Sequence, residues 1–353
     1  MTLTLVRLQD IPYLDLSKLE GRQVVLMPFW DGSSWHAWAP VQGGYLDMRP
    51  VDAAKSDYVA DRPARQDDLF VPFIDLMWQR ASWPDVVPRI SAVIDDFHHL
   101  FASVAKLEFF RRHSGDLSLF DHEAFAQTKL EYMVTVARSI FDLVHEVVRI
   151  LWGQYTRLLD PNDERRRSAC QLPERFARMV LHDKTPVSQD ALVETYALPP
   201  ALCEAYLRQL PFFVQLRALR DRTVHGFGAV PRISFTERGF AIDVDHHVFQ
   251  GLISWTDEHR FNDRLVSLLP VIAQLVVGTV NACSDLMRAF SAQIALPPEL
   301  APGKRIFVRC PHSFVVGPLL AAVRGEIAWW PPEGGLTADS SAGIGVEEAS
   351  VPK

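Results

Sequence analysis

A stretch of twenty uncharged residues, 265–284, most constrains what this chain can fold into. Its length is close to what a helix needs to cross a bilayer, so it predicts either a membrane span or a buried helix of a bundle. Its polar residues recur at every seventh position, and the series continues past the stretch: Ser267, Gln274, Asn281 and Arg288. Such spacing puts them on one narrow stripe of a helix, and Pro270 further weakens the membrane signal. We therefore expect a buried helix, from about residue 257 to 294, and no membrane span.

The composition is that of a folded, soluble protein. The 353 residues are 48% hydrophobic and 22% charged, which excludes a disordered, collagen-like or coiled-coil chain. This length favours two domains, or one large domain with a smaller unit appended. With 36 Lys and Arg against 43 Asp and Glu, the net charge is −7. The chain therefore does not hold nucleic acid by bulk positive charge, although a local basic cleft stays possible.

The cysteines indicate a reducing compartment. All four stand far apart and form no CxxC pair: Cys170, Cys203, Cys283 and Cys310. Neither a disulfide framework nor a zinc ribbon has such spacing. Residues 1–10 lack the apolar core and the small-residue cleavage site of a secretory signal. We therefore expect a cytoplasmic protein.

Four regions are expected along the chain. Residues 1–85 form a β-rich unit, because short apolar runs alternate there with Gly and Pro, and residues 50–68 within it are an exposed connector. Residues 86–300 form a helical domain. Residues 301–330 form a short extension with one strand. Residues 331–353 form a disordered tail, because Gly, Ser, Ala and Glu follow one another there without periodicity.

Two long helices open the helical domain. Apolar residues recur at three and four positions over 88–110, which is the period of an amphipathic helix. A second helix begins at Asp121, a good N-cap, and extends to about residue 159. Its polar residues form one stripe: Glu131, Thr135, Arg138, Asp142, His145 and Arg149. This stripe is either a solvated edge or the lining of a polar cleft, and in a cleft Arg138, Asp142 and His145 are secondary candidates for a site.

Shorter elements follow these helices. Helices are expected over residues 174–182, 189–197 with Ser188 as N-cap, 200–210, and 212–225 with Pro211 at its start. Apolar and polar residues then alternate on both sides of Glu237-Arg238-Gly239, which predicts a β-hairpin.

Several common catalytic motifs are absent from the sequence. It contains no Walker A loop, no GxGxxG after a strand, no GxSxG elbow and no HExxH. We therefore expect no nucleotide or dinucleotide cofactor and no zinc. The dipeptide His182-Asp183 is similar to the metal-binding pair of the HD phosphohydrolases, but no further spacing supports it.

The best local signal is an arginine and a histidine five residues apart, Arg220 and His225, at the end of an expected helix. Metal-free RNA cleavage needs a group that moves a proton at the 2′-hydroxyl or the leaving oxygen, and a cation near the phosphate oxygens. His225 and Arg220 fit these two roles. Asp221 lies one turn before His225 and could orient its ring, and Arg217 and Arg222 could add phosphate contacts.

This Arg220–His225 pattern resembles the RxxxxH motif of the HEPN family, the higher eukaryotes and prokaryotes nucleotide-binding domain. The resemblance covers about residues 88–295. It implies a mainly α fold, a helical bundle that here carries an inserted β-hairpin and a small β-rich N-terminal unit. It also implies a metal-independent endoribonuclease that acts on RNA as a homodimer, in the role of a toxin or defence effector, with an antitoxin or another protein as partner.

The family pattern is matched with two departures. Arg138 and His145 give a second match at a looser spacing, but Ser139 stands where the family usually has an amide or acidic residue. Phe227 stands where the nucleotidyltransferase-coupled toxins of the family carry a regulatory Tyr, so the resemblance does not extend to that regulation.

Two other interpretations stay open. An Arg-Asp-Arg run on a helix is often a solvated face, and a His before a Gly is a common helix end. In that case the chain is a non-catalytic helical module that binds a protein partner. Metal-dependent phosphohydrolysis at His182-Asp183 is the third hypothesis.

Overall fold

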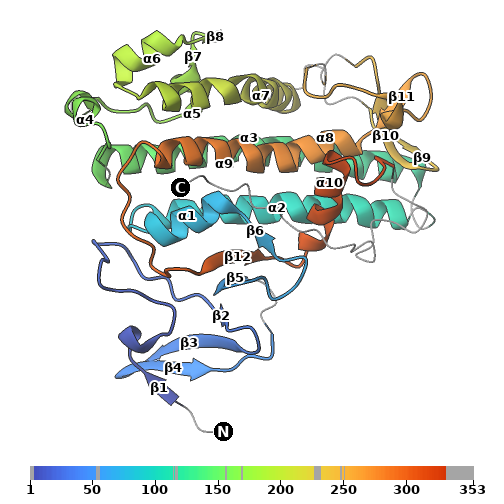
Figure 1. The fold of residues 1–353 in the computed structure, drawn as a ribbon. Coiled ribbons are helices and arrows are strands. Elements are labelled where there is room, and N and C mark those ends of the chain that lie inside the picture. The colour runs from blue at the N-terminus through green and yellow to red at the C-terminus, as the bar shows by residue number, and fades with distance from the viewer. Residues whose placement is uncertain are drawn as a thin grey trace.

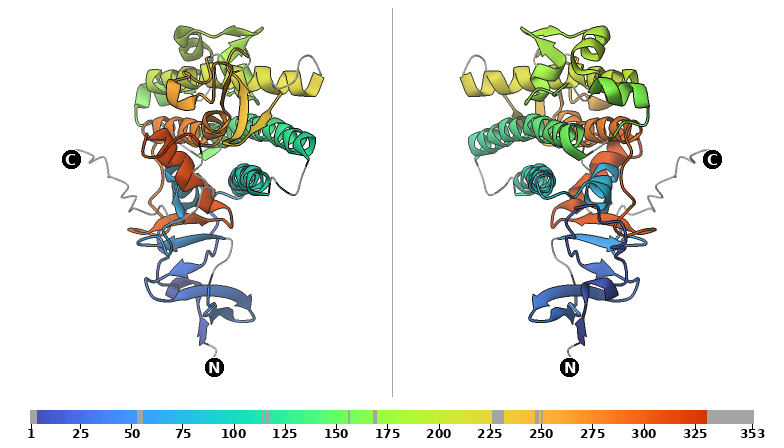
Figure 2. Two further views of the ribbon diagram at one scale, coloured as in Figure 1. Left: turned by 90° about the vertical axis from the view of Figure 1, so that its right-hand side faces the viewer. Right: turned by 90° about the vertical axis from the view of Figure 1, so that its left-hand side faces the viewer.

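The computed structural model describes residues 4–52, 56–113, 115, 118–155, 157–167, 170–225, 232–246, 249 and 251–330. A β-sheet lies at one end, and layers of helices are stacked on it (Figures 1 and 2). Helices hold 51% and strands 15% of the described residues. The expected fold class, a mainly α HEPN-like bundle, is therefore wrong, because a large mixed sheet carries one end of the molecule and the fold is a mixed α and β fold. The expected tail, 331–353, lies outside the described residues.

Within the described residues, seven strands form the large sheet. All neighbouring pairs are antiparallel except the parallel pair β2–β5. In order across the sheet the strands are β1 (Thr4–Val6), β4 (Gly44–Met48), β3 (Trp35–Val41), β2 (Phe29–Trp30), β5 (Ser56–Ala60), β12 (Arg305–Arg309) and β6 (Leu69–Phe70). Strand β12 comes from the other end of the chain, so this sheet joins two segments far apart in the sequence (Figure 1).

The segment expected as an exposed connector, residues 50–68, contains the inner strand β5. Tyr58 and Ala60 have no exposed surface in β5, and Val59 is nearly as buried. The strand is only five residues long and is flanked by Asp, Arg and Pro, which hid it in the sequence. It lies between β2 and β12, and the longer of these pairings is with β12, where Ala60 lies opposite Arg305. So distant a pairing leaves no local pattern in the sequence.

The two long helices predicted after the N-terminal unit are confirmed. They are α2 (Val87–Arg112) and α3 (Leu119–Ile150), and α3 continues into a π-helical turn, η3 (Leu151–Tyr155). The Oγ of Ser118, rather than Asp121, caps α3, because it accepts from the N–H of Asp121 at 3.1 Å. An additional helix, α1 (Pro72–Arg80), precedes them in the segment expected to hold only strands.

The next helices lie on the far side of α3 from the sheet (Figure 1). They and the small hairpin between them are α4 (Pro161–Arg167), α5 (Phe176–Val180), β7 (Leu181–His182), β8 (Thr185–Pro186), α6 (Gln189–Tyr196) and α7 (Pro200–His225). Ser188 caps α6 as predicted. Helix α7 is continuous through Pro211, where two helices were expected. Proline removes one helical hydrogen bond, but Phe213 and Leu216 beside it are fully buried, so packing holds the helix together.

The predicted β-hairpin is present and has a third strand. β9 (Ser234–Thr236) pairs with β10 (Gly239–Asp243), which pairs with β11 (Leu265–Ser267). The long uncharged helix therefore starts later than expected, at Leu269, as α8 (Leu269–Ala273), the π-helical turn η6 (Gln274–Gly278) and α9 (Thr279–Ser291). The remaining short elements are η1 (Leu8–Asp10), η5 (Asp257–His259), η7 (Ser313–Val315) and α10 (Val316–Val323).

The helix Leu269–Ser291 is long and apolar enough to cross a membrane by length and composition, and it is the one such helix among the described residues. About two thirds of its most apolar window, 67%, is buried inside the protein. It lies in the same layer as α3 and contacts both α3 and α7 (Figure 1). Such burial is typical of a helix in the core of a folded domain.

A buried ion pair ties β12 into the sheet. Arg309 is almost fully buried and donates from Nε and Nη2 to the carboxylate of Asp68, at 2.7 and 2.5 Å. The Tyr58 hydroxyl donates to the same carboxylate at 2.6 Å. The guanidinium lies over the rings of Trp35 and Tyr58, 4.8 and 5.4 Å from their centroids. Charge, hydrogen bonds and aromatic contacts therefore all hold β12 beside β5.

Replacing Asp68 by Asn should destabilise the protein by about 3 kcal/mol, because the buried guanidinium loses its main counter-charge. The measurement is urea unfolding followed by circular dichroism. The matched control is Asp61→Asn, which breaks the exposed pair with Lys304 and should cost less than about 1 kcal/mol. Equal losses in both variants would contradict the central role of the Arg309–Asp68 pair.

Candidate functional site

The predicted motif lies in the last turns of α7. The carboxylate of Asp221 pairs with Arg220 Nη1 at 3.1 Å and with Arg217 Nε at 3.7 Å. All three side chains are at least one third exposed, and Arg222 beside them is half-buried. The structure therefore brings Arg217, Arg220 and Asp221 together on an open face.

His225 is the last residue of α7, so its backbone is where the sequence predicted a helix end. Its side chain lies outside the described residues, and so do Gly226, Phe227 and Gly228. Asp221, expected to orient His225, pairs with Arg217 and Arg220.

Two of the secondary candidates on α3, Arg138 and Asp142, make contacts between α3 and the neighbouring helices. Arg138 and Asp142 are ion-paired, and the Arg138 guanidinium lies 5.0 Å from the ring centroid of Phe213 on α7. Oδ1 of Asp142 accepts from the backbone N–H of Phe176, the first residue of α5, at 3.1 Å. These two side chains therefore hold α5 and α7 against α3.

His145 is fully buried and cannot meet a substrate in this structure. Its Nε2 lies 2.8 Å from the carbonyl oxygen of Pro173, which can only accept, so Nε2 carries the proton. Nδ1 then accepts from the Tyr206 hydroxyl at 2.9 Å. Burial lowers the pKa of His145 to about 4, and the ring is neutral at physiological pH. The α3 stripe is thus neither a solvated edge nor an open cleft at this point.

His182-Asp183 stands in the tip of the β7–β8 hairpin. Both side chains are almost fully exposed, and positive φ angles at Asp183 and Lys184 form the two-residue turn. Among the described residues, no group of three or more His, Cys, Asp or Glu is placed to hold a metal ion. The geometry gives the phosphohydrolase hypothesis no support.

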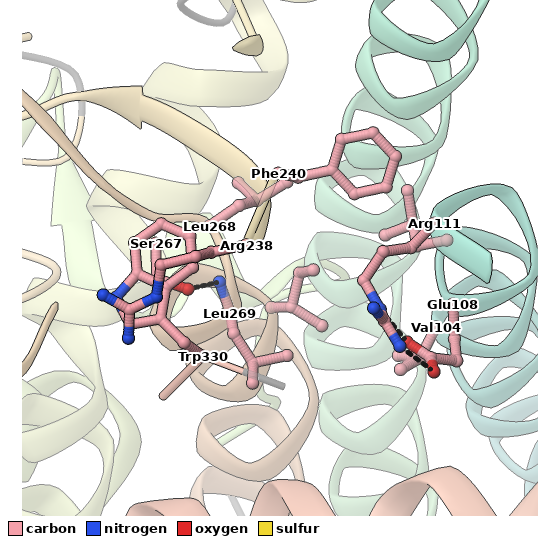
Figure 3. Close-up of a pocket in the computed structure, with 11 residues that line it drawn as sticks. Val104, Glu108, Arg111, Arg238, Phe240, Ser267, Leu268, Leu269 and Trp330 are labelled. Carbon is pink, nitrogen blue, oxygen red and sulfur yellow. Dashed lines mark hydrogen bonds and ion pairs between the residues drawn. The ribbon is translucent and has the colours of Figure 1, made fainter. Parts of the chain in front are cut away.

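A cavity that the sequence did not indicate lies between α2, the β9–β10 hairpin and the start of α8 (Figure 3). Its polar lining includes Glu108, Arg111, Arg238 and Ser267, and Trp330 closes one side. These residues come from segments up to 222 positions apart, and only the three-residue spacing of Glu108 and Arg111 was a local signal.

Known protein families, curated proteins and solved structures give no match to this chain. A function must therefore be inferred from the residues of the chain itself.

The free energy of unfolding should decrease as the pH is lowered, because His145 becomes protonated. Its pKa is about 4 in the folded protein and about 6.5 when unfolded, so the unfolded state binds the proton first as pH falls. The contribution is complete above pH 6.5, and about 3 kcal/mol is lost between pH 6.5 and 4.

The measurement is the free energy of urea unfolding at pH 7.5 and pH 5. Because carboxylates titrate as well, the informative quantity is the difference between variants. His145→Gln should reduce the pH dependence, whereas the exposed His182→Gln should not. An unchanged slope in His145→Gln would refute this account.

Proposed function

We propose that the C-terminal end of α7 binds RNA and cleaves it without a metal ion, with Arg220 and His225 as catalytic residues. The exposure of Arg220 and Asp221 supports this most. Helix α7 is buried over much of its length, at Leu202, Tyr206 and Phe213 among others, yet Arg220 and Asp221 keep 43% and 41% of their side-chain surface exposed. Cations on an open face can reach a phosphate.

The ion pairs of the motif can change partners at small cost. An exposed Arg–Asp pair contributes only about 0–1 kcal/mol, whereas a phosphate offers a guanidinium two strong, charged hydrogen bonds. RNA therefore competes with Asp221 for Arg220 and Arg217. Asp221, once released, is one turn from His225 and can orient its ring.

The proposed reaction is attack of the 2′-hydroxyl oxygen on the adjacent phosphorus. The P–O5′ bond breaks, and the products are a 2′,3′-cyclic phosphate and a 5′-hydroxyl. The 2′-hydroxyl gives its proton to solvent, and the leaving oxygen takes one from protonated His225. Arg220 stabilises the charge on the phosphorus oxygens. The homodimer and the role as toxin or defence effector rest on the resemblance to the RxxxxH motif alone, and no shared fold is part of the proposal.

Arg220→Ala and His225→Ala should each lower RNA cleavage in EDTA by about 100-fold or more, because each removes a group that acts in the transition state. The assay follows end-labelled RNA and tests the products for a cyclic phosphate. Arg264→Ala, another exposed Arg paired with an Asp, is the control and should keep full activity. Full activity in folded Arg220→Ala and His225→Ala proteins would exclude this mechanism.

A second candidate function is protein binding, and exposed apolar side chains at the neighbouring ends of α2 and α3 favour it. Phe109 at the end of α2, and Leu119 and Phe120 at the start of α3, are more than half exposed, with Phe120 at 76%. Phe125, one turn further, packs on Phe110 with ring centroids 5.2 Å apart, which holds the two helix ends together. Such grouping is typical of a protein-binding surface.

If protein binding is the function, the wild-type protein should cleave no RNA at any concentration. It should instead be isolated from its native host in a stable complex with its partner. The double variant Leu119→Ser/Phe120→Ser should lose that complex, because the partner would have no apolar side chains to bury. Leu159→Ser, at an exposed Leu elsewhere, is the control. An equally stable complex with the double variant would rule out this surface.

A further inference from the structure

The cavity in Figure 3 is small and partly open to solvent. A volume of about 40 Å³ inside it is open to the centre of a water molecule, and about 10–15 Å³ of such volume holds one water. Roughly three waters would fit, which together occupy about 90 Å³ of liquid. That is the size of an organic molecule with about six non-hydrogen atoms rather than of a nucleotide.

Two arginines stand on opposite sides of the cavity (Figure 3). Arg111 is held by the buried Glu108 through two hydrogen bonds of 2.9 Å. Arg238 lies over the ring of Trp330, 4.8 Å from its centroid. Gly239, next to Arg238, comes so close to Arg111 that a Cβ added there would lie 3.3 Å from Cδ of that arginine. The hairpin turn thus fixes the positions of both cations.

The charges around the cavity do not cancel. Three charged side chains line it: Glu108 carries one negative charge, and Arg111 and Arg238 carry one positive charge each. Arg238 forms no ion pair with a carboxylate in the described part of the chain, where the Trp330 ring is its recorded partner. The site therefore has a net positive charge, and Arg238 can bind an anion.

A hydrogen-bond donor is present beside Arg238. Trp330 is 95% buried by its neighbours, with 5% exposed, and no acceptor for its Nε1–H is found among the described residues. The tryptophan is held in place from two sides. The Ser267 hydroxyl donates to the carbonyl of Trp329 at 2.9 Å, and the ring of Phe261 lies 5.8 Å from that of Trp330. An unused buried donor costs about 1–3 kcal/mol, and an anionic acceptor would satisfy it.

The remaining lining is apolar: Val104, Leu107, Phe240, Leu268, Leu269 and Ile272. We infer that this cavity binds a small monocarboxylate with an apolar body, such as a short-chain fatty acid. The carboxylate is bound by Arg238 and the indole N–H of Trp330, and the hydrocarbon part lies against Phe240 and Leu269. The site uses none of the residues of the α7 motif, so it is independent of RNA cleavage.

Titration of the full-length protein with sodium butyrate tests this inference. The readout is the indole N–H resonance of Trp330 in a ¹⁵N–¹H spectrum, assigned by its disappearance in Trp330→Phe, with calorimetry alongside. Butyrate should shift this resonance to saturation. Butyramide, which has the same shape without the charge, should bind at least about tenfold more weakly, because charged hydrogen bonds are the stronger ones.

Arg238→Met should weaken butyrate binding at least about tenfold, whereas Arg264→Met, an exposed arginine next to β11 of the same small sheet, should leave it unchanged. Equal binding of butyrate and butyramide to the wild type would overturn the inference even if the Arg238 variant failed to fold. Unchanged affinity in a folded Arg238→Met protein, or no shift of the Trp330 resonance at saturation, would overturn it as well.

Discussion

The burial of the Arg309 guanidinium is the constraint on which the arrangement of this protein depends. A charge inside a protein is strongly unfavourable unless it is paired and its donors are bound. Asp68 and Asp52 supply carboxylates, and Trp35 and Tyr58 supply rings. These partners all come from the first 70 residues, so the C-terminal part of the chain must place Arg309 beside the N-terminal segment. The chain can satisfy this only if β12 lies between β5 and β6, in the interior of the N-terminal sheet.

Helix α1 connects the strand that contains Arg309 to the layers of helices. Asp75, on α1, accepts from the N–H of Ile306 in β12 at 2.8 Å, and burial raises its pKa. Gln79, one turn later, binds the carbonyl of Lys304 and the N–H of Ala301. The segment leading from α9 to β12 is therefore anchored to one face of α1. The same helix contacts α2 and α9, so the position of the sheet and the position of the helices are set together.

Short-range sequence patterns predicted the elements that interactions between neighbouring residues determine, such as helices and their first residues. The apolar period over 88–110 predicted α2, the Ser188 hydroxyl predicted the start of α6, and Arg220 and Asp221 lie, as expected, near the end of a helix. The sheet was not predictable in this way, because β5 is five residues long and its partner strand begins about 245 positions later. The role of His145 was missed for the same reason, since Tyr206 and the Pro173 carbonyl are distant in sequence.

Three Arg–Asp pairs show why residue types alone could not separate structure from function. The side chains of Arg309 and Asp68 are 3% and 1% exposed, those of Arg138 and Asp142 are 15% and 33%, and those of Arg220 and Asp221 are 43% and 41%. The first pair cannot exchange its partner without leaving a buried charge unpaired. The second holds helices together. Only in the third does water already solvate both groups, so that an incoming anion replaces a weak contact. Exposure, set by distant packing, therefore decides which of these arginines can exchange its carboxylate partner for another anion.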